Sequence, residues 1–254
     1  MSAVGARETR AFASETKFVV PKAVGAAIRD WARRYLEADP HGTGRFADEY
    51  RTTTIYFDSP GYDVFHQRRS FGRSKYRIRQ YDGSAEVFLE RKLRRPGMLT
   101  KRRTLVSAAT LPRLETNEPA AWAGDWFHRR LLLRQLRPVC EISYHRMARA
   151  GKASAGPIRL TLDERIQVIG ANRPAFDGRE DGVRIIDECT ILELKYRAEV
   201  PSLFKQLVEE FGLRPQATSK YRLGIAAINP AGTTNVATTQ SGEAQPANGG
   251  PPCG

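Results

Sequence analysis

Residues 75–92 read KYRIRQYDGSAEVFLERK, a pattern that predicts a β-hairpin with one charged face. Lys75, Arg77 and Arg79 occupy alternate positions, a short turn follows, and Glu90 and Lys92 are again two residues apart. Because successive side chains of a strand point to opposite faces, each charged set shares one side of the hairpin. A solvated sheet surface and a binding site for a strongly anionic molecule both fit this pattern.

The whole chain is basic, with 41 Lys and Arg against 28 Asp and Glu over 254 residues, a net charge of +13. Much of the excess lies between Arg68 and Arg103, where thirteen Lys and Arg against three Asp and Glu give +10. Such a balance favours anionic partners, namely nucleic acid, an acidic membrane surface or phosphorylated small molecules. The charge is therefore concentrated in or beside the hairpin.

The sequence contains no apolar run long enough to span a membrane. Its start, MSAVGARETR, lacks the apolar core of a signal peptide. The histidines and cysteines do not have the spacing of zinc ligands. We therefore expect a cytoplasmic protein without a structural zinc.

The order of patterns predicts one α+β domain over residues 12–228, with a flexible lead at 1–11 and a disordered tail at 229–254. Apolar residues at helical spacing predict helices at 22–38, 119–136 and 202–212 and a short one at 219–228. Alternating or β-branched stretches predict about eight mainly antiparallel strands. These strands fall at 15–20, 50–60, 75–92, 99–106, 138–149, 157–170, 182–188 and 189–197.

One small motif, Glu-x-Lys, recurs in three predicted strands, at residues 15–17, 90–92 and 193–195. On a strand near 158–163, charged residues alternate with an apolar reverse face. If the predicted helices cover the apolar faces, the charged faces look inward, and a sheet closed on itself encloses a polar lumen. Unpaired buried cations are costly, and a polyanion relieves that cost. Arg and Lys suit phosphate oxygens, and a nearby Glu can hold Mg²⁺ or Mn²⁺.

Several short motifs occur in an order that resembles the vacuolar transporter chaperone (VTC) domain, over residues 12–228. They are ETKF, TTTIYFDSP, KYRIRQY, VFLERK, TKRR, SYHRMA, IRLTLDE, ILELKY and SKYRLG. That domain is the polyphosphate-polymerase branch of the triphosphate tunnel metalloenzymes. The resemblance implies an eight-stranded antiparallel β tunnel, a closed barrel with helices packed outside. Ala13 stands where the wider superfamily often has the first Glu of Glu-x-Glu-x-Lys, which agrees better with the VTC branch than with a two-metal hydrolase.

The resemblance also implies roles for individual residues. Catalytic contacts to phosphate are expected from Arg77, Arg79, Lys92, Arg146 and Arg159, and further phosphate binding from Lys17, Lys101, Ser219 and Lys220. Arg102 or Arg103 can take the place of Lys101 after a shift of one residue. Glu193 resembles the carboxylate that holds the metal ion, Mn²⁺ or Mg²⁺. Glu15, Glu90 and Lys195 are expected to line the lumen, either in direct contact with ligand or in mutual ion pairs.

The function implied is a polymerase that transfers the γ-phosphoryl group of ATP to inorganic polyphosphate. A tunnel triphosphatase and a non-catalytic polyphosphate-binding module are the alternatives. Aromatic residues between the cations keep a nucleic-acid-binding domain open, but cations that alternate with apolar residues favour an enclosed lumen. We therefore expect ATP and polyphosphate as partners and no nucleic acid. Export of the product across a membrane is expected to need a separate protein.

Overall fold

The structure is a computed structural model that describes residues 14–40, 42–95, 98–118 and 121–229. The predicted flexible lead at 1–11 and all but the first residue of the predicted tail at 229–254 lie outside the described residues. Among the described residues, no helix is both long and apolar enough to cross a lipid bilayer.

The fold is α+β and is built on one antiparallel sheet of ten strands. Eight strands follow one another in the order β1-β10-β8-β7-β3-β4-β5-β6, while β2 pairs with β7 and β9 pairs with β8. The strand bounds are β1 Ser14–Pro21, β2 Glu37–Ala38, β3 Glu49–Asp58, β4 Ser74–Tyr81, β5 Glu86–Arg95, β6 Met98–Ser107, β7 Arg137–Ala153, β8 Gly156–Gly170, β9 Val183–Arg184 and β10 Cys189–Tyr196. The helices are α1 Lys22–Tyr35, α2 Asp125–Leu133, α3 Ser202–Glu210 and α4 Lys220–Ile228, with 3-10 turns at Phe71–Arg73 and Ala108–Glu115.

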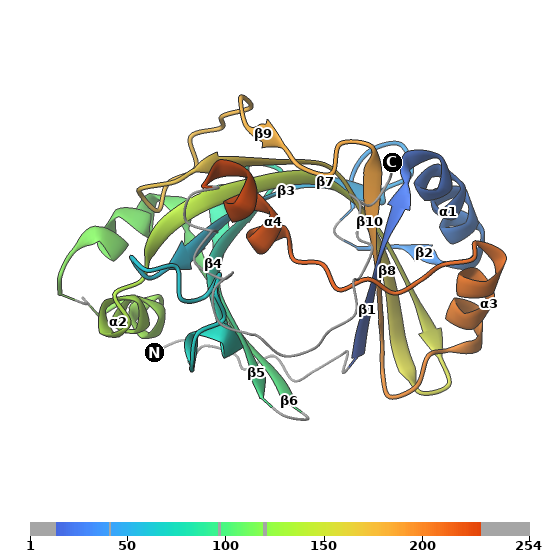
Figure 1. Ribbon diagram of the computed structural model, residues 1–254, viewed down its shortest axis with the longest axis horizontal. Helices are drawn as coiled ribbons and strands as arrows, with labels where there is room; N and C mark the ends of the chain where they lie inside the picture. The colour runs from blue at the N-terminus through green and yellow to red at the C-terminus, as the bar shows by residue number, and fades with distance from the viewer. Residues whose placement is uncertain (1–13, 41, 96–97, 119–120, 230–254) are drawn as a thin grey trace, which may run out of the picture.

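The sheet curls strongly but does not close, as Figure 1 shows. Strand β7 pairs irregularly with both of its long neighbours. Its register with β8 shifts near Tyr144 of β7, and its register with β3 shifts near Tyr56 of β3, so that the sheet bends at its middle. The expectation of a closed barrel is wrong, because no pairing joins β1 to β6 among the described residues. The expected number of eight strands is not confirmed, since the described sheet has two short strands, β2 and β9, beyond the eight of the main path. A side-chain contact spans the opening instead: Lys92 Nζ of β5, the strand next to the edge strand β6, lies 3.4 Å from Glu15 Oε2 of the edge strand β1. Inward charged side chains on edge strands disfavour backbone pairing.

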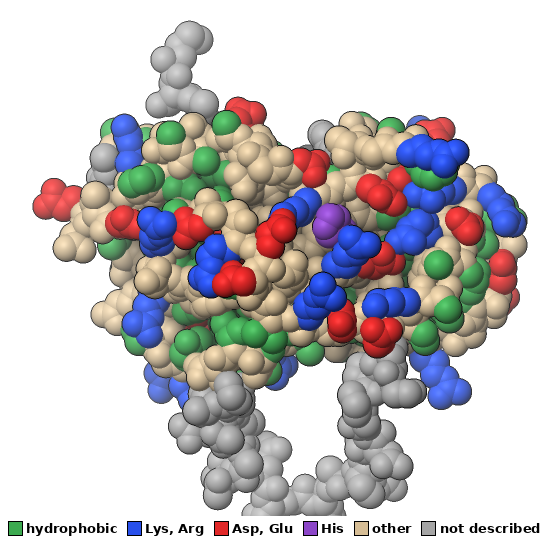
Figure 2. Space-filling view, turned by 90° about the horizontal axis from the view of Figure 1, so that it is seen from above, with side chains coloured by type: hydrophobic (Ala, Val, Ile, Leu, Met, Phe, Trp, Pro, Cys, Tyr) green, Lys and Arg blue, Asp and Glu red, His purple; other side chains and the backbone are tan. Residues whose placement is uncertain are grey.

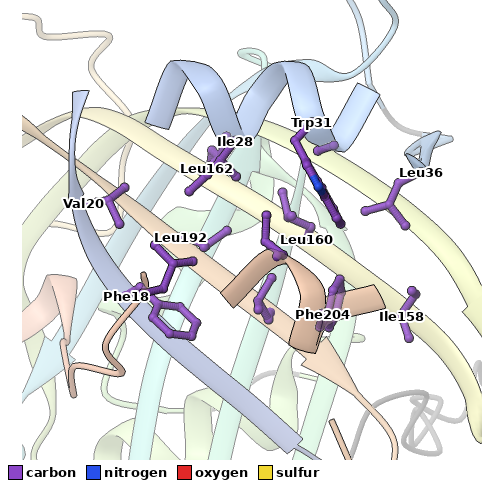
Figure 3. Packing of buried hydrophobic residues seen from close by; sticks show 14 of the residues in the cluster. Phe18, Val20, Ile28, Trp31, Leu36, Ile158, Leu160, Leu162, Leu192 and Phe204 are labelled. Atoms are coloured by element: carbon purple, nitrogen blue, oxygen red, sulfur yellow. The ribbon is translucent and has the colours of Figure 1, made fainter. Parts of the chain in front are cut away.

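The convex face of the sheet is apolar and is covered by helices. On β1, β10 and β8 it presents Phe18, Leu192 and Leu160, which pack against α1 and α3 (Figure 3). On β4 and β5 it presents residues such as Ile78 and Leu89, which share a core with Phe127 of α2. Burial of these side chains, about 1.5–3 kcal/mol each, fixes which side of every strand faces inward.

Helix α4 is the exception, because it lies inside the curve of the sheet (Figure 1). Its Tyr221 and Ile225 pack on Ile142 and Val168, which lie on the concave face. A Cβ on Gly224 would meet the Ile142 Cδ1 at 3.0 Å, so glycine permits this close approach. The expectation that helices pack outside is therefore confirmed for α1, α2 and α3 and wrong for α4, since apolar residues at this end of the concave face need cover.

The outer surface does not concentrate one sign of charge in the way the concave face does. Lys and Arg side chains are interspersed there with Asp and Glu in the view of Figure 2. Examples of exposed pairs are Arg51–Glu180 at 2.6 Å and Arg179–Asp181 at 2.8 Å. An anionic ligand is therefore expected on the concave face.

Candidate active site

The strand register places the predicted site residues of the sheet on the concave face. Residues directly opposite one another in an antiparallel pair share a face. The pairings that establish this are Arg77 with Glu90 and Glu90 with Arg103, Lys92 with Lys101, Lys17 with Glu193, Glu15 with Lys195, Lys195 with Arg159, and Arg146 with Asp163. Arg79 pairs with Thr54, which in turn faces Ile142 under α4. Ser219 and Lys220 join them from the start of α4.

Glu90 is the centre of the densest charge cluster. Its carboxylate is 1% exposed and lies within 4 Å of four cations. The distances to Oε2 are 2.7 Å from Arg77 Nε and 3.9 Å from Arg79 Nη1, and those to Oε1 are 3.2 Å from Lys101 Nζ and 3.3 Å from Arg103 Nε. Burial raises the pKa of Glu90, but the four cations outweigh it and hold the pKa well below its usual value. The cluster therefore keeps three excess positive charges directed at the concave space.

Asp163 anchors a second pair of cations. It accepts two hydrogen bonds from Arg146, at 2.6 and 2.8 Å, and lies 2.6 Å from Lys220 Nζ. Burial raises the pKa of Asp163, but Arg146 and Lys220 outweigh it and bring it to about 2. Asp163 is thus an ionised acceptor that fixes Arg146 and Lys220.

A third group of charges lies where β1 meets β10. Glu193 Oε1 is 3.0 Å from Lys195 Nζ, and Lys17 Nζ is 3.1 Å from Glu15 Oε1. Burial raises the pKa of Glu193, but Lys195, Lys17 and a hydrogen bond with the Glu15 carboxyl outweigh it and hold the pKa well below its usual value. Burial lowers the pKa of Lys17, yet Glu193 and Glu15 raise it overall.

Arg159 is opposite Lys195 in the β8–β10 pairing but contacts other partners. Its Nη2 is 2.9 Å from Asp39 Oδ2 and donates to the Tyr50 hydroxyl at 2.9 Å. The structure therefore brings the predicted residues to one face, but it distributes them over several ion-paired groups.

Two further cations lie on the concave face: Lys75, which was given no individual role from the sequence, and Arg103, which was named only as an alternative to Lys101. Lys75 precedes Arg77 by two residues, and its Nζ donates to Ser219 Oγ at 2.9 Å. Arg103 follows Lys101 by two residues, so both face inward, while Arg102 points away and stacks on Trp126 at 4.1 Å. Asp39, the partner of Arg159, lies beyond the short strand β2 and has no local sequence signal.

The carboxylates suit a metal ion only in part. Among the described residues, no group of three or more His, Cys, Asp or Glu side chains is arranged to hold one. Glu193, which is opposite Lys17 in the strand pairing, and Glu15, whose Oε1 is 3.1 Å from Lys17 Nζ, supply two carboxyl groups beside Lys17. Mg²⁺ is commonly held by one or two carboxylates together with substrate phosphates, so this pair fits a metal that arrives with a phosphate ligand.

Comparisons with known proteins agree with this arrangement. The sequence profile of the VTC domain matches residues 12–229. A candidate adenylate cyclase from Bacillus halodurans is 17% identical, with a TM-score of 0.52 over 81% of this chain and 92% of that one. A candidate adenylyl cyclase from Hippeastrum, described as having a dominant triphosphatase activity, is 14% identical, with a TM-score of 0.47 over 82% and 92%.

No protein with curated annotation matches significantly. The likeness to the Bacillus halodurans protein shows a shared fold and no more, because the identity is 17%. The profile match covers most of the chain and includes all the concave-face charges described above. On that ground the chain belongs to the VTC-domain family.

Proposed function

We propose that this protein is a polyphosphate polymerase, which transfers the γ-phosphoryl group of ATP to the end of an inorganic polyphosphate chain. The observation that carries the proposal is the Glu90 cluster, where four cations share one buried carboxylate. A polyphosphate or triphosphate neutralises the excess charge, and Arg77 and Arg79 can grip its equatorial oxygens. Membership of the VTC-domain family supports the same substrate class.

The reaction needs little covalent chemistry from the protein. A terminal oxygen of the polyphosphate acceptor, already ionised at neutral pH, attacks the γ-phosphorus, and the bond from that phosphorus to the β–γ bridging oxygen breaks. ADP leaves with the bridging oxygen, and the chain is one phosphate longer. Arg77, Arg79 and their neighbours align the two phosphates and stabilise the charge on the equatorial oxygens.

A divalent metal ion, Mn²⁺ or Mg²⁺, supplies additional charge neutralisation on the phosphate oxygens when it is bound. Glu193 is the residue proposed to hold it, with Glu15 beside it. Without a metal ion, Glu15 pairs with Lys17 and Glu193 pairs with Lys195, and these ion pairs hold the two carboxyl groups on the concave face.

A tunnel triphosphatase is the second candidate, because it uses the same phosphate cradle but directs water at the terminal phosphate. A water nucleophile benefits from a general base with a pKa near neutrality. Glu90, Asp163 and Glu193 instead have lowered pKa values. A carboxylate with a pKa raised to about 7, Glu141, is opposite Ile55 and so points to the convex side. The polymerase is therefore favoured.

The test is to incubate the purified protein with ATP and Mn²⁺ or Mg²⁺ and to separate the products on a gel that resolves phosphate chains. Ladders of polyphosphate together with ADP are the expected result. Release of inorganic phosphate without ladders would show a hydrolase. Tight binding of polyphosphate with no turnover would show the binding module.

A further inference from the structure

A cavity of about 570 Å³ opens at one end of the concave face, next to the start of α4. Its walls come from β1, β4, β5, the segment after β3, and α4. Two of its sides differ in chemistry, one being cationic and the other apolar. A volume of this size accommodates a small molecule such as a nucleotide.

Lys17, Lys75 and Lys92 form the cationic side, and of the described residues that line the cavity Glu15 is the one acid. Glu15 pairs with Lys17 and Lys92, at 3.1 and 3.4 Å. Within the described part of the chain, Lys75 has no carboxylate partner and donates only to Ser219 Oγ. Burial, followed by Lys17, Lys92, Arg77 and Arg222, lowers the pKa of Lys75 to about 8. An anion bound at this side of the cavity would therefore relieve the most charge repulsion.

The apolar side is formed by Val64, Phe65, Leu223 and Ala226. Arg222 lies over the Phe65 ring at 5.8 Å from its centroid, which adds a planar cation to this side. Phosphate chains are charged at every unit and gain little from such a surface. A purine ring gains from both features, since it buries apolar area and stacks on planar groups.

We propose that this cavity binds the nucleoside of the donor nucleotide, with its base against Phe65 and Leu223 and its first phosphates at Lys75. The inference rests on the proposed function, in which ATP is the phosphoryl donor. The inference sets the orientation of the bound nucleotide along the concave face, because Lys75, Arg77 and Arg79 follow one another along β4 about 7 Å apart. The γ-phosphate then lies near Arg77 and Arg79, and the acceptor chain approaches from the opposite end, where Arg159 and Tyr50 lie.

The test fills the apolar side without disturbing the core. Ala226 is an exposed residue of α4 that lines the cavity, whereas its neighbour Ala227 is equally exposed but does not line it. We expect Ala226→Trp to raise the Kd for ATP at least ~10-fold and to change the Kd for inorganic tripolyphosphate less than ~2-fold, as titration calorimetry with Mg²⁺ measures. Ala227→Trp is the matched control and should change neither constant.

Other outcomes overturn the inference. Equal weakening of ATP and tripolyphosphate by Ala226→Trp would mean that the cavity receives phosphate chain, and an unchanged Kd for ATP would mean that the nucleoside binds elsewhere. Either result leaves the proposed function intact, provided that the wild-type protein still makes polyphosphate ladders from ATP. If the wild-type protein binds tripolyphosphate but not ATP, both the inference and the choice of donor are wrong.

Discussion

Replacing Glu90 by Gln is the most informative single change in the concave face. The substitution keeps the size of the side chain but removes the one negative charge shared by Arg77, Arg79, Lys101 and Arg103. The four cations then repel one another in a site where the carboxylate was 1% exposed. We expect the ligand-free protein to lose stability and to regain part of it when a phosphate chain binds.

The magnitude follows from the burial of the cluster. Removing one partner of a buried ion pair costs about 3–5 kcal/mol, and the Arg77–Glu90 contact at 2.7 Å is of that kind. For a chain of this size, each kcal/mol corresponds to a change of about 2–4 °C in Tm, so a fall on the order of 10 °C is expected. Tripolyphosphate at 100 times its Kd adds about 2.7 kcal/mol to any protein that binds it, and the more cationic variant should bind it more tightly.

The assay is thermal unfolding of the wild-type and variant proteins, with and without tripolyphosphate. Glu86→Gln is the matched control, since Glu86 lies on the same strand but is exposed. The pKa of Glu90 is lower in the folded protein than its usual value of 4.5. The ionised Glu90 therefore stabilises the folded protein above about pH 4.5, and this stabilisation is lost as the pH falls below that value. A Tm for Glu90→Gln within 2 °C of wild type, or a smaller gain from tripolyphosphate, would refute the reasoning.

Three further predictions concern the same face. Arg79→Ala should lower turnover at least ~100-fold with an unchanged circular dichroism spectrum. Arg91→Ala, on the opposite face of β5, is the control and should leave turnover unchanged. Normal product ladders from Arg79→Ala would remove the proposed role of Arg79. Glu193→Gln should lose metal-dependent turnover while still binding tripolyphosphate by calorimetry, and unchanged activity would remove its metal role. The pKa of Lys75 is about 8, so its ammonium group loses its charge as the pH rises. The affinity of the wild-type protein for tripolyphosphate should therefore fall about tenfold from pH 7 to 9. An equal fall in the affinity of a Lys75→Gln variant would contradict this prediction.

The hairpin at residues 75–92 could be predicted from sequence because two simple rules act on it together. Strand alternation assigns Arg77 and Glu90 to one face, and the apolar Ile78 and Leu89 fix the other face against the core. The same rules apply to β1, β8 and β10, whose apolar faces lie under α1 and α3. Alternation also includes Lys75 and Arg103, which lie in the motifs KYRIRQY and TKRR, so the sequence places both on the charged face.

Closure of the sheet could not be predicted by such rules. Alternation tells which side chains face inward, but it does not tell whether the first and last strands approach closely enough to pair. That depends on the accumulated bend at Tyr144 and Tyr56 and on the charges of the edge strands. The resemblance to a tunnel family suggested closure, whereas among the described residues β1 and β6 do not pair, and an ion pair between Lys92 of β5 and Glu15 of β1 spans the opening.

The position of α4 is the other feature that sequence patterns did not give, and it is the one that shapes the site. Its N-terminal Ser219 contacts Lys75, its Lys220 contacts Asp163, and its Tyr221 hydroxyl donates to Asp58 at the end of β3. One helix therefore ties together strands that are far apart in the sheet order. Because the same helix supplies Leu223 and Ala226 to the cavity, the part of the site that holds phosphate and the part proposed to hold the nucleoside are built on a single element. A change that displaces α4 should impair both together, whereas Ala226→Trp should separate them.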